Sequence, residues 1–306
     1  MSWNDSHCKN SPYAPRSIPP RRRPSALWVL LIAALSMLTL TAALAGLPST
    51  EKGLAPLTDA PAADERLTDR TGLSFTSSGV TSTYHLYAEG LNWTEPVGMM
   101  IYTDGSGEYG LAHPRSNYLL GGKDGLVAVA KRHNMVLVTP RAPGGGCSDG
   151  EGVCWYGASS GISPAQKAEW AEDLVSDVQS DYPIDTSRIA VGGYSSGAQM
   201  MTQHWIPSGA AERTMQAGVV VSISYGGAPR RSVQTSEVFK RTVHLNWNTG
   251  SEDAAYTSGH RDGVKRGLSW YADQGFDTSL DLELGVGHGR SRAFGRIMEA
   301  QIVEHL

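Results

Sequence analysis

The chain has 306 residues, and its formal net charge is only −4. The charge is unevenly spread: residues 1–45 hold five Lys or Arg and one acid, so 21 basic and 29 acidic residues remain in the rest of the chain. A net charge of −8 with no basic stripe in that part excludes nucleic acid as the expected partner.

The N-terminus has the pattern of an export signal or a membrane anchor. Residues 1–25 are basic and proline-rich, and residues 26–47 are uncharged and mostly apolar. The second segment ends near Ala43-Leu44-Ala45, which fits the small-residue pattern read by signal peptidase. It is also long enough to span a bilayer, which takes roughly 20 apolar residues. A cleaved signal and a retained anchor both stay open, and either places the folded part outside the cell or in the cell envelope.

Residues 48–72 are rich in proline, alanine and charge and have no sustained apolar period, which predicts a linker. Residues 73–306 then suit a single domain.

The cysteine count is odd, and export accounts for it. Cys8 lies before the apolar segment, whereas Cys147 and Cys154 belong to the exported part. Disulfides persist in oxidising compartments, so we predict a bridge between Cys147 and Cys154. Two free thiols are the alternative. A zinc site is disfavoured, because no second Cys or His pair lies nearby at ligand spacing.

Strand and helix signals alternate along the predicted domain. Continuous apolar strands alternating with helices predict a mostly parallel sheet covered on both faces, an α/β fold. No stretch between 198 and 241 is long enough for a large cap domain. The expected strands are 73–80, 82–89, 97–103, 135–140, 188–193, 217–224, 242–248 and 279–286, and the expected helices are 117–133, one opening at Ser163-Pro164, one from 198, 254–273 and 291–304.

The stretch Gly193-Tyr194-Ser195-Ser196-Gly197 fits the pattern G-x-S-x-G between a buried strand and a helix. At such a turn the nucleophilic serine has glycine two residues before and two residues after it. Only Ser195 meets this spacing, so we predict that it is the nucleophile. The backbone N–H of Ser196 is then predicted to bind the developing oxyanion. A purely structural glycine turn is the alternative.

A serine nucleophile needs a base, and the base needs an orienting acid. In enzymes with this turn, the acid and the histidine follow the serine at the ends of later strands. Asp253 follows the strand 242–248, and His288 follows the last strand. Glu252 stays open as the acid, and Asp262 is a weaker candidate because we expect it inside a helix.

The second oxyanion donor is expected in the loop after the strand 97–103. We assign it to the backbone N–H of Ser106, with Gly105 as the alternative. The same loop matches G-x-G-x-x-G, a dinucleotide-binding pattern. His113-Pro114 interrupts the helix that such a site requires, and no acid ends the next strand. No cofactor and no metal is therefore expected.

With these residues assembled, the sequence resembles a secreted α/β-hydrolase of the serine esterase and polyhydroxyalkanoate-depolymerase type. The resemblance is carried by GGYSSG, NTGSED, GVGHGR and the Cys147 to Trp155 loop. It implies the α/β-hydrolase fold, a triad of Ser195, Asp253 and His288, and a substrate cleft bordered by Trp155. Tyr194, inside the serine motif, is a second expected cleft residue.

The sequence therefore predicts an exported serine hydrolase that cleaves carboxylic esters through an acyl-enzyme. One alternative is an envelope acyltransferase of the mycolyltransferase kind, which uses the same triad. The other is a non-catalytic cell-surface binding domain on a hydrolase scaffold.

Overall fold

A computed structural model of the chain describes residues 67–306, apart from 147–151, 159, 261 and 290–292. The segments predicted at 1–25 and 26–47, and most of the predicted linker 48–72, lie outside the described residues. The first strand begins at Arg70, three residues earlier than expected. No helix in the described part of the chain is long and apolar enough to cross a bilayer.

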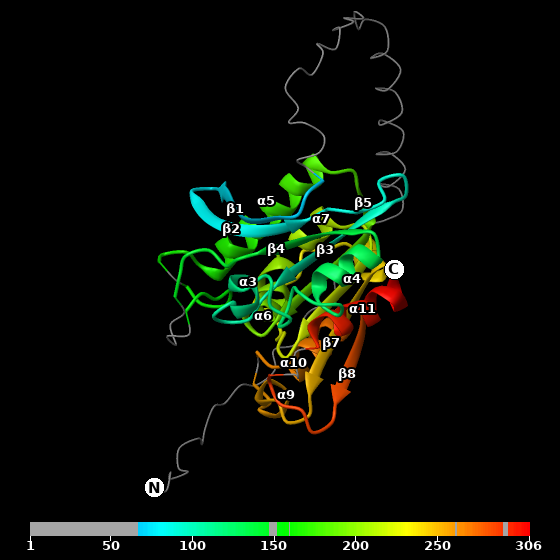
Figure 1. Ribbon diagram of the computed structural model, residues 1–306. Helices are drawn as coiled ribbons and strands as arrows, with labels where there is room; N and C mark the ends of the chain where they lie inside the picture. The colour runs from blue at the N-terminus through cyan, green and yellow to red at the C-terminus, as the bar shows by residue number, and fades with distance from the viewer. Residues whose placement is uncertain (1–66, 147–151, 159, 261, 290–292) are drawn as a thin grey trace, which may run out of the picture. The chain divides into compact units, whose positions relative to one another are not determined.

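Eight strands form one sheet in the order β1-β2-β4-β3-β5-β6-β7-β8 (Figure 1). β2 runs antiparallel to both β1 and β4, and the remaining neighbours are parallel, which confirms the predicted mostly parallel sheet. The strands are β1 Arg70–Ser77, β2 Val80–Tyr87, β3 Val97–Thr103, β4 Met135–Pro140, β5 Ile184–Tyr194, β6 Gly218–Ile223, β7 Val243–Gly250 and β8 Asp277–Glu283.

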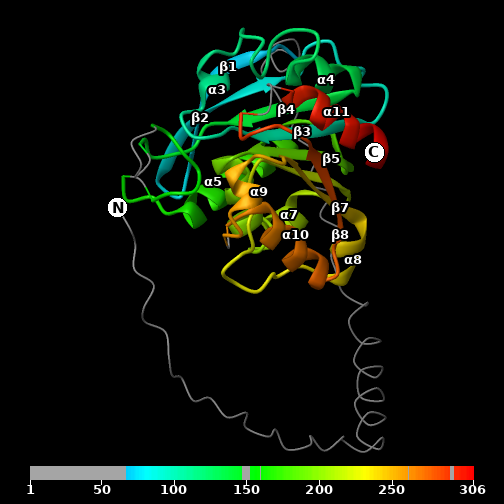
Figure 2. The same ribbon diagram turned by 90° about the horizontal axis from the view of Figure 1, so that it is seen from below.

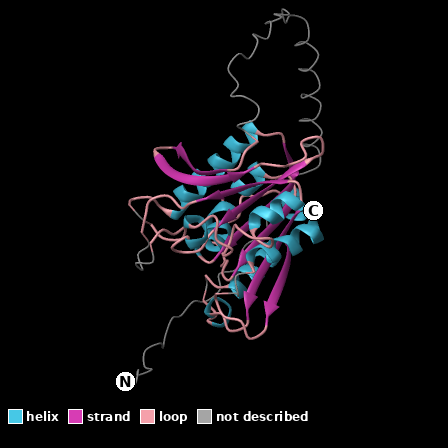
Figure 3. Cartoon of the chain, viewed as in Figure 1, coloured by secondary structure: helices cyan, strands magenta, loops and turns pink. Residues whose placement is uncertain are grey.

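Helices cover both faces of the sheet, so its central strands are buried on two sides (Figures 2 and 3). Helices α4 and α11 lie over one face, and α5, α7 and α10 lie over the other. The helical elements are α3 Tyr109–Ala112, α4 Leu126–Arg132, α5 Pro164–Asp181, α6 Ser196–Met200, the π-helix η1 Met201–Trp205, α7 Ala210–Thr214, α8 Glu237–Thr242, α9 Ala254–Thr257, α10 Val264–Asp273 and α11 Phe294–His305.

Two expected helices are shorter than their apolar patterns. The expected helix 117–133 is helical only over α4, because the chain before it turns tightly and Gly122 has a φ of 81°. The expected helix 254–273 is divided into α9 and α10, and Gly259 between them has a φ of 64°. Left-handed backbone of this kind ends an α-helix, and apolar periodicity alone does not reveal it.

The parallel register gathers several strand ends at one edge of the sheet. Thr103 is paired with Gly193, Tyr194 with Ile223, and Ile223 with Asn248. The loops after β3, β5, β6 and β7 therefore leave the sheet side by side. Ligand sites in open α/β sheets lie at this edge, outside the carboxyl ends of the strands.

Helix α10 approaches the backbone of the loop after β6 at Gly267. A Cβ atom placed there would lie 1.8 Å from the carbonyl oxygen of Gly226. Alanine normally stabilises a helix relative to glycine, but here the clash with backbone dominates. We expect Gly267→Ala to lower the free energy of unfolding by about 3 kcal/mol and Tm by about 6–12 °C.

Thermal and urea unfolding check this expectation. Ser269→Ala is the matched control, since it adds alanine to the exposed face of the same helix and should leave Tm nearly unchanged. Equal Tm values for the two variants would contradict the close approach at Gly267.

Candidate active site

The turn from β5 into α6 holds Ser195 in a strained conformation, with φ 49° and ψ −110°. Glycines on both sides make room for the turn. A Cβ atom on Gly193 would lie 2.8 Å from the backbone nitrogen of Ala198, and one on Gly197 would lie 2.4 Å from the carbonyl oxygen of Thr103. Strain of this kind costs about 1–3 kcal/mol and is concentrated at functional sites. The glycine spacing thus has a direct steric cause.

Three side chains that are distant in the sequence meet at this turn. His288 Nε2 lies 3.0 Å from Ser195 Oγ, and His288 Nδ1 lies 3.0 and 3.1 Å from the two carboxylate oxygens of Asp253. A carboxylate only accepts hydrogen bonds, so the Nδ1 atom carries the proton. Nε2 is then left to accept the hydrogen bond that the Ser195 hydroxyl donates.

The local chain explains why Asp253 is the acid beside His288. It caps the N-terminus of α9, where its Oδ1 accepts from the N–H of Ala255 at 2.8 Å, and it is fully buried. Burial raises the pKa of Asp253, but the hydrogen bonds from His288 and Ala255 lower it by more than burial raises it. The pKa of Asp253 therefore lies below its usual value. Glu252 is exposed, and its backbone N–H donates to the carbonyl oxygen of Val286.

Asp262 departs from its predicted position. It lies in the turn before α10 rather than inside a helix, and its carboxylate accepts a 2.6 Å hydrogen bond from Gln203 Nε2. Left-handed backbone at Gly259 follows the end of α9, before the chain reaches this residue. Asp262 therefore lines a hollow that opens beside Ser195.

Tyr194 supports the histidine loop. Its hydroxyl donates to the carbonyl oxygen of His288 at 3.0 Å, and the two rings lie 5.4 Å apart. A Cβ atom on Gly105 would lie 2.6 Å from the Tyr194 ring. Tyr194 is therefore wedged between the histidine loop and the loop after β3, and it does not line the hollow at Ser195 as expected.

The loop after β3 brings Ser106 to the same hollow as Ser195 and Ser196. The N–H of Gly105 is occupied, because it donates to Asp104 Oδ1 at 2.8 Å. Within the described part of the chain, the N–H groups of Ser106 and Ser196 have no hydrogen-bond partner. Of the two candidates in this loop, Ser106 therefore has the backbone N–H that is available to bind an oxyanion, and Gly105 does not.

Two buried carboxylates hold that loop. Asp104 accepts from the N–H groups of Gly105 and Gly110, and Glu108 accepts from the N–H of Ala142 and from Arg141 Nε. Burial raises the pKa of Asp104 to about 6 and that of Glu108 to about 7. Nothing in the sequence pattern indicates either carboxylate as an anchor of the loop.

The raised pKa of Asp104 makes stability depend on pH. An acid with a folded pKa above its unfolded value of 3.8 binds its proton more tightly in the folded state. The contribution of Asp104 to the free energy of unfolding is therefore complete below pH 3.8 and is lost as the pH rises through about 6. The amide in Asp104→Asn does not titrate, so from below pH 4 to pH 7 the wild type should lose about 3 kcal/mol of unfolding free energy relative to this variant. Urea unfolding across this range measures the difference, and a flat difference would contradict the assignment.

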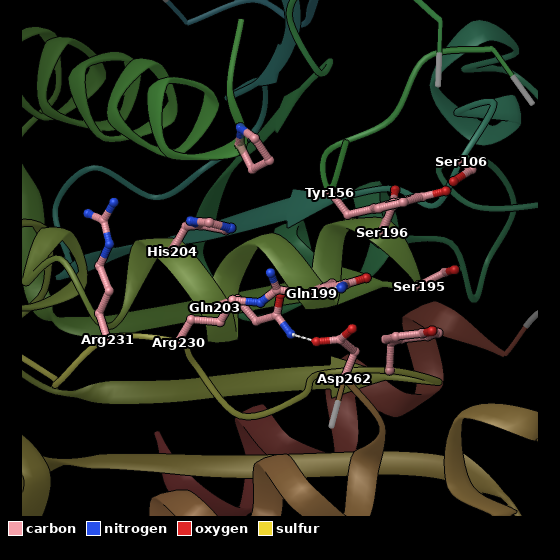
Figure 4. Close-up of a pocket in the computed structure, with 12 residues that line it drawn as sticks. Ser106, Tyr156, Ser195, Ser196, Gln199, Gln203, His204, Arg230, Arg231 and Asp262 are labelled. Carbon is pink, nitrogen blue, oxygen red and sulfur yellow. Dashed lines mark hydrogen bonds between the residues drawn. The ribbon is translucent and has the colours of Figure 1, made fainter. Parts of the chain in front are cut away.

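A hollow of about 560 Å³ opens beside Ser195 (Figure 4). Most of its lining is polar, and it extends along the helix that follows the serine turn. The lining residues are Ser106, Tyr156, Pro164, Ser195, Ser196, Gln199, Gln203, His204, Tyr225, Arg230, Arg231 and Asp262.

The prediction that Trp155 borders the cleft is wrong. Trp155 is fully buried and belongs to the hydrophobic core, whereas the next residue, Tyr156, lines the hollow. An indole buries more apolar surface than a phenol, so the core takes Trp155 and leaves the polar ring outside. Cys154 beside it is buried, and the predicted bridge to Cys147 lies outside the described residues because Cys147 does.

Most of the polar residues that line this hollow were not predicted from the sequence. Gln199 and Gln203 are four residues apart and so share a helix face, which was a readable signal. Arg230 and Arg231 come from an irregular loop, where no periodicity indicates direction. Across the described ranges, no cluster of three or more His, Cys, Asp or Glu side chains is arranged to hold a metal ion.

Neither a family model nor a curated protein matches the chain. Among solved structures, the chain is similar to a thermostable esterase, with a TM-score of 0.54 and 16% identity over 76% of this chain and 62% of that one. The chain is also similar to a mutant feruloyl esterase module from Clostridium thermocellum, complexed with sinapinate. The TM-score is 0.50 and the sequence identity 14%, over 77% of this chain and 88% of that one. For an S-formylglutathione hydrolase from Agrobacterium tumefaciens, the TM-score is 0.49 and the sequence identity 12%, over 78% of this chain and 97% of that one.

Identities this low show the fold alone. The eight-stranded, mostly parallel sheet with helices on both faces is the α/β-hydrolase fold, and the described residues contain no large cap domain. The predicted fold class is therefore confirmed.

Proposed function

We propose that the chain is an exported serine hydrolase that cleaves carboxylic esters, with Ser195, His288 and Asp253 as its catalytic triad. The observation that carries this proposal is the unbroken chain of hydrogen bonds from Ser195 Oγ through the imidazole of His288 to the fully buried carboxylate of Asp253. The esterase names of the structural neighbours agree with it. The basic and apolar N-terminal segments support export, as a cleaved signal or as an anchor.

The geometry gives each group one task. His288 Nε2 takes the hydroxyl proton as Ser195 Oγ attacks the ester carbonyl, and the N–H groups of Ser196 and Ser106 bind the resulting oxyanion. His288 then gives the proton to the leaving alcohol. Asp253 keeps the imidazole oriented and stabilises its charged form. Water attacks the acyl-enzyme by the same route and releases the acid.

The proposed subtype is a secreted esterase related to polyhydroxyalkanoate depolymerases, with a bridge between Cys147 and Cys154. The open hollow at Ser195 supports a small or extended ester, since no large cap covers it within the described residues. Intact mass under non-reducing conditions tests the bridge: a mass two hydrogens below that of the reduced chain is expected.

Covalent labelling tests the proposal most directly. A fluorophosphonate probe should modify the full chain once, and peptide mapping should place the adduct on Ser195. Ser195→Ala should not label. Ser196→Ala, the matched neighbour, should still label because it keeps its backbone N–H. No adduct on the folded wild type, or equal labelling of Ser195→Ala, would overturn the proposal and favour a binding domain.

A further inference from the structure

Two arginines stand at the far end of the hollow that contains Ser195. Arg230 and Arg231 are both exposed and both line it, together with His204. In Figure 4, Arg231 and His204 lie at one end of the hollow, and Ser195 and Ser106 lie at the other. Within the described ranges, neither guanidinium forms an ion pair or a hydrogen bond. Arg230 and Arg231 follow one another in the chain, and their side chains extend in different directions from the loop (Figure 4). A guanidinium group without an acidic partner is suited to bind an anion.

The positive charge here is local. The folded part of the chain is acidic overall, so its general field disfavours anions. Asp262, the acid in the wall, is already bound by Gln203. Burial and the charges of Arg231 and Arg230 both lower the pKa of His204, so the two guanidinium charges act on the same point of the wall.

The helix after Ser195 sets the distance between the two ends. Gln199 donates to Gln203 along one face of this helix, and Gln203 lies eight residues after Ser195. At 1.5 Å per residue, that separation is about 12 Å. The π-helical turn η1 carries Gln203 and His204, and such turns are frequent at functional sites. An extended chain covers about 12 Å in roughly 10 bonds.

From this arrangement we infer that Arg230 and Arg231, with His204 beside them, form an anion subsite that binds a carboxylate on the substrate. The subsite lies at the end of the hollow away from Ser195, on the order of 12 Å along the helix. The inference rests on the proposed esterase function and specifies its substrate class: esters that carry an anionic arm of about ten bonds. A second hollow of about 460 Å³ shares Gln203, His204 and Arg231. It leaves room for the arm to continue past the arginines.

Half-ester kinetics test the subsite. Nitrophenyl half-esters of succinate, suberate, sebacate and undecanedioate are compared with the methyl-capped diesters of the same acids. We expect kcat/KM to favour the free carboxylate about 10-fold for the long acids and little for succinate, which is too short. Salt should reduce the preference. A second series, 9-butyryloxynonanoate against its methyl ester, shows whether the arm belongs to the alcohol instead of the acid.

Charge-matched variants separate the subsite from general steering. Arg230→Gln/Arg231→Gln should reduce the free-to-capped ratio to about 2 or below. Arg241→Gln/Arg296→Gln removes the same charge from other exposed positions and should keep the ratio. No preference in the wild type for either series, or an equal reduction in both double variants, would overturn the subsite.

A binding measurement distinguishes failure of the subsite from failure of the esterase proposal. In Ser195→Ala, saturation-transfer NMR follows monomethyl undecanedioate, and the two arginine substitutions should weaken its binding about 10-fold. Weakened binding supports the subsite whether or not any ester is cleaved. Binding that does not change in the arginine variant refutes the subsite, while hydrolysis of neutral esters by the wild type still supports the esterase.

Discussion

Replacing Ser195 with alanine is expected to lower kcat for a soluble nitrophenyl ester about 10⁶-fold. The change removes the attacking oxygen and with it the acyl-enzyme route. Folding should not suffer, because the hydroxyl contacts His288 Nε2 and holds no other part of the turn. Alanine and serine both carry a Cβ atom, so the strained backbone with its φ of 49° costs the two variants about the same. Steady-state rates at saturating ester, with Tm as the folding check, measure the effect.

Non-additivity provides the control for this variant. Residues of a triad act as one unit, so Ser195→Ala combined with Asp253→Asn should be hardly slower than Ser195→Ala alone. If the double variant instead lost the product of the two single-variant fold-changes in kcat, Asp253 would support activity by a route that does not pass through Ser195. A Ser195→Ala enzyme that keeps more than about a hundredth of the wild-type kcat would remove Ser195 from the role of nucleophile.

Replacing Asp253 with asparagine is expected to lower kcat about 10⁴-fold. The N–H of Ala255 holds one side-chain oxygen at 2.8 Å, so the amide NH₂ would take the position of the other oxygen beside His288. An NH₂ group donates to Nδ1 and moves the imidazole proton to Nε2. His288 could then no longer accept the hydroxyl proton of Ser195. Steady-state kcat with the same ester measures the loss.

Glu252→Gln is the matched control for the acid. It changes the neighbouring carboxylate in the same way, but that residue is exposed, and kcat should stay within about twofold of the wild type. A larger loss for Glu252→Gln than for Asp253→Asn would move the acid to Glu252. Binding of substrate, read as KM, should change little in both variants.

Hydrolysis and acyl transfer share these steps and differ only in the acceptor. Product analysis with and without a sugar acceptor separates them: free acid in both cases indicates hydrolysis, and a new sugar ester indicates transfer.

Local patterns in the sequence were sufficient for the order of the eight strands and for the loops that carry Ser195 and His288, whereas the short helices α3, α7 and α8 were not predicted. Apolar periodicity and glycine spacing are local properties, and each has a local steric or packing cause. The glycines around Ser195 are required by contacts with the helix and the neighbouring strand, so their spacing distinguishes that serine from the next one. The ends of parallel strands must meet at one edge, which brings the histidine loop to the serine.

Residues that are neighbours in the chain are told apart only by tertiary packing. Asp253 and Glu252 differ by one position, and the cap of α9 turns one carboxylate toward His288 and leaves the other in solvent. Trp155 and Tyr156 are separated in the same way by packing against the core. The wall at Arg230 and Arg231 is formed by an irregular loop, whose direction depends on long-range contacts and leaves no period in the sequence.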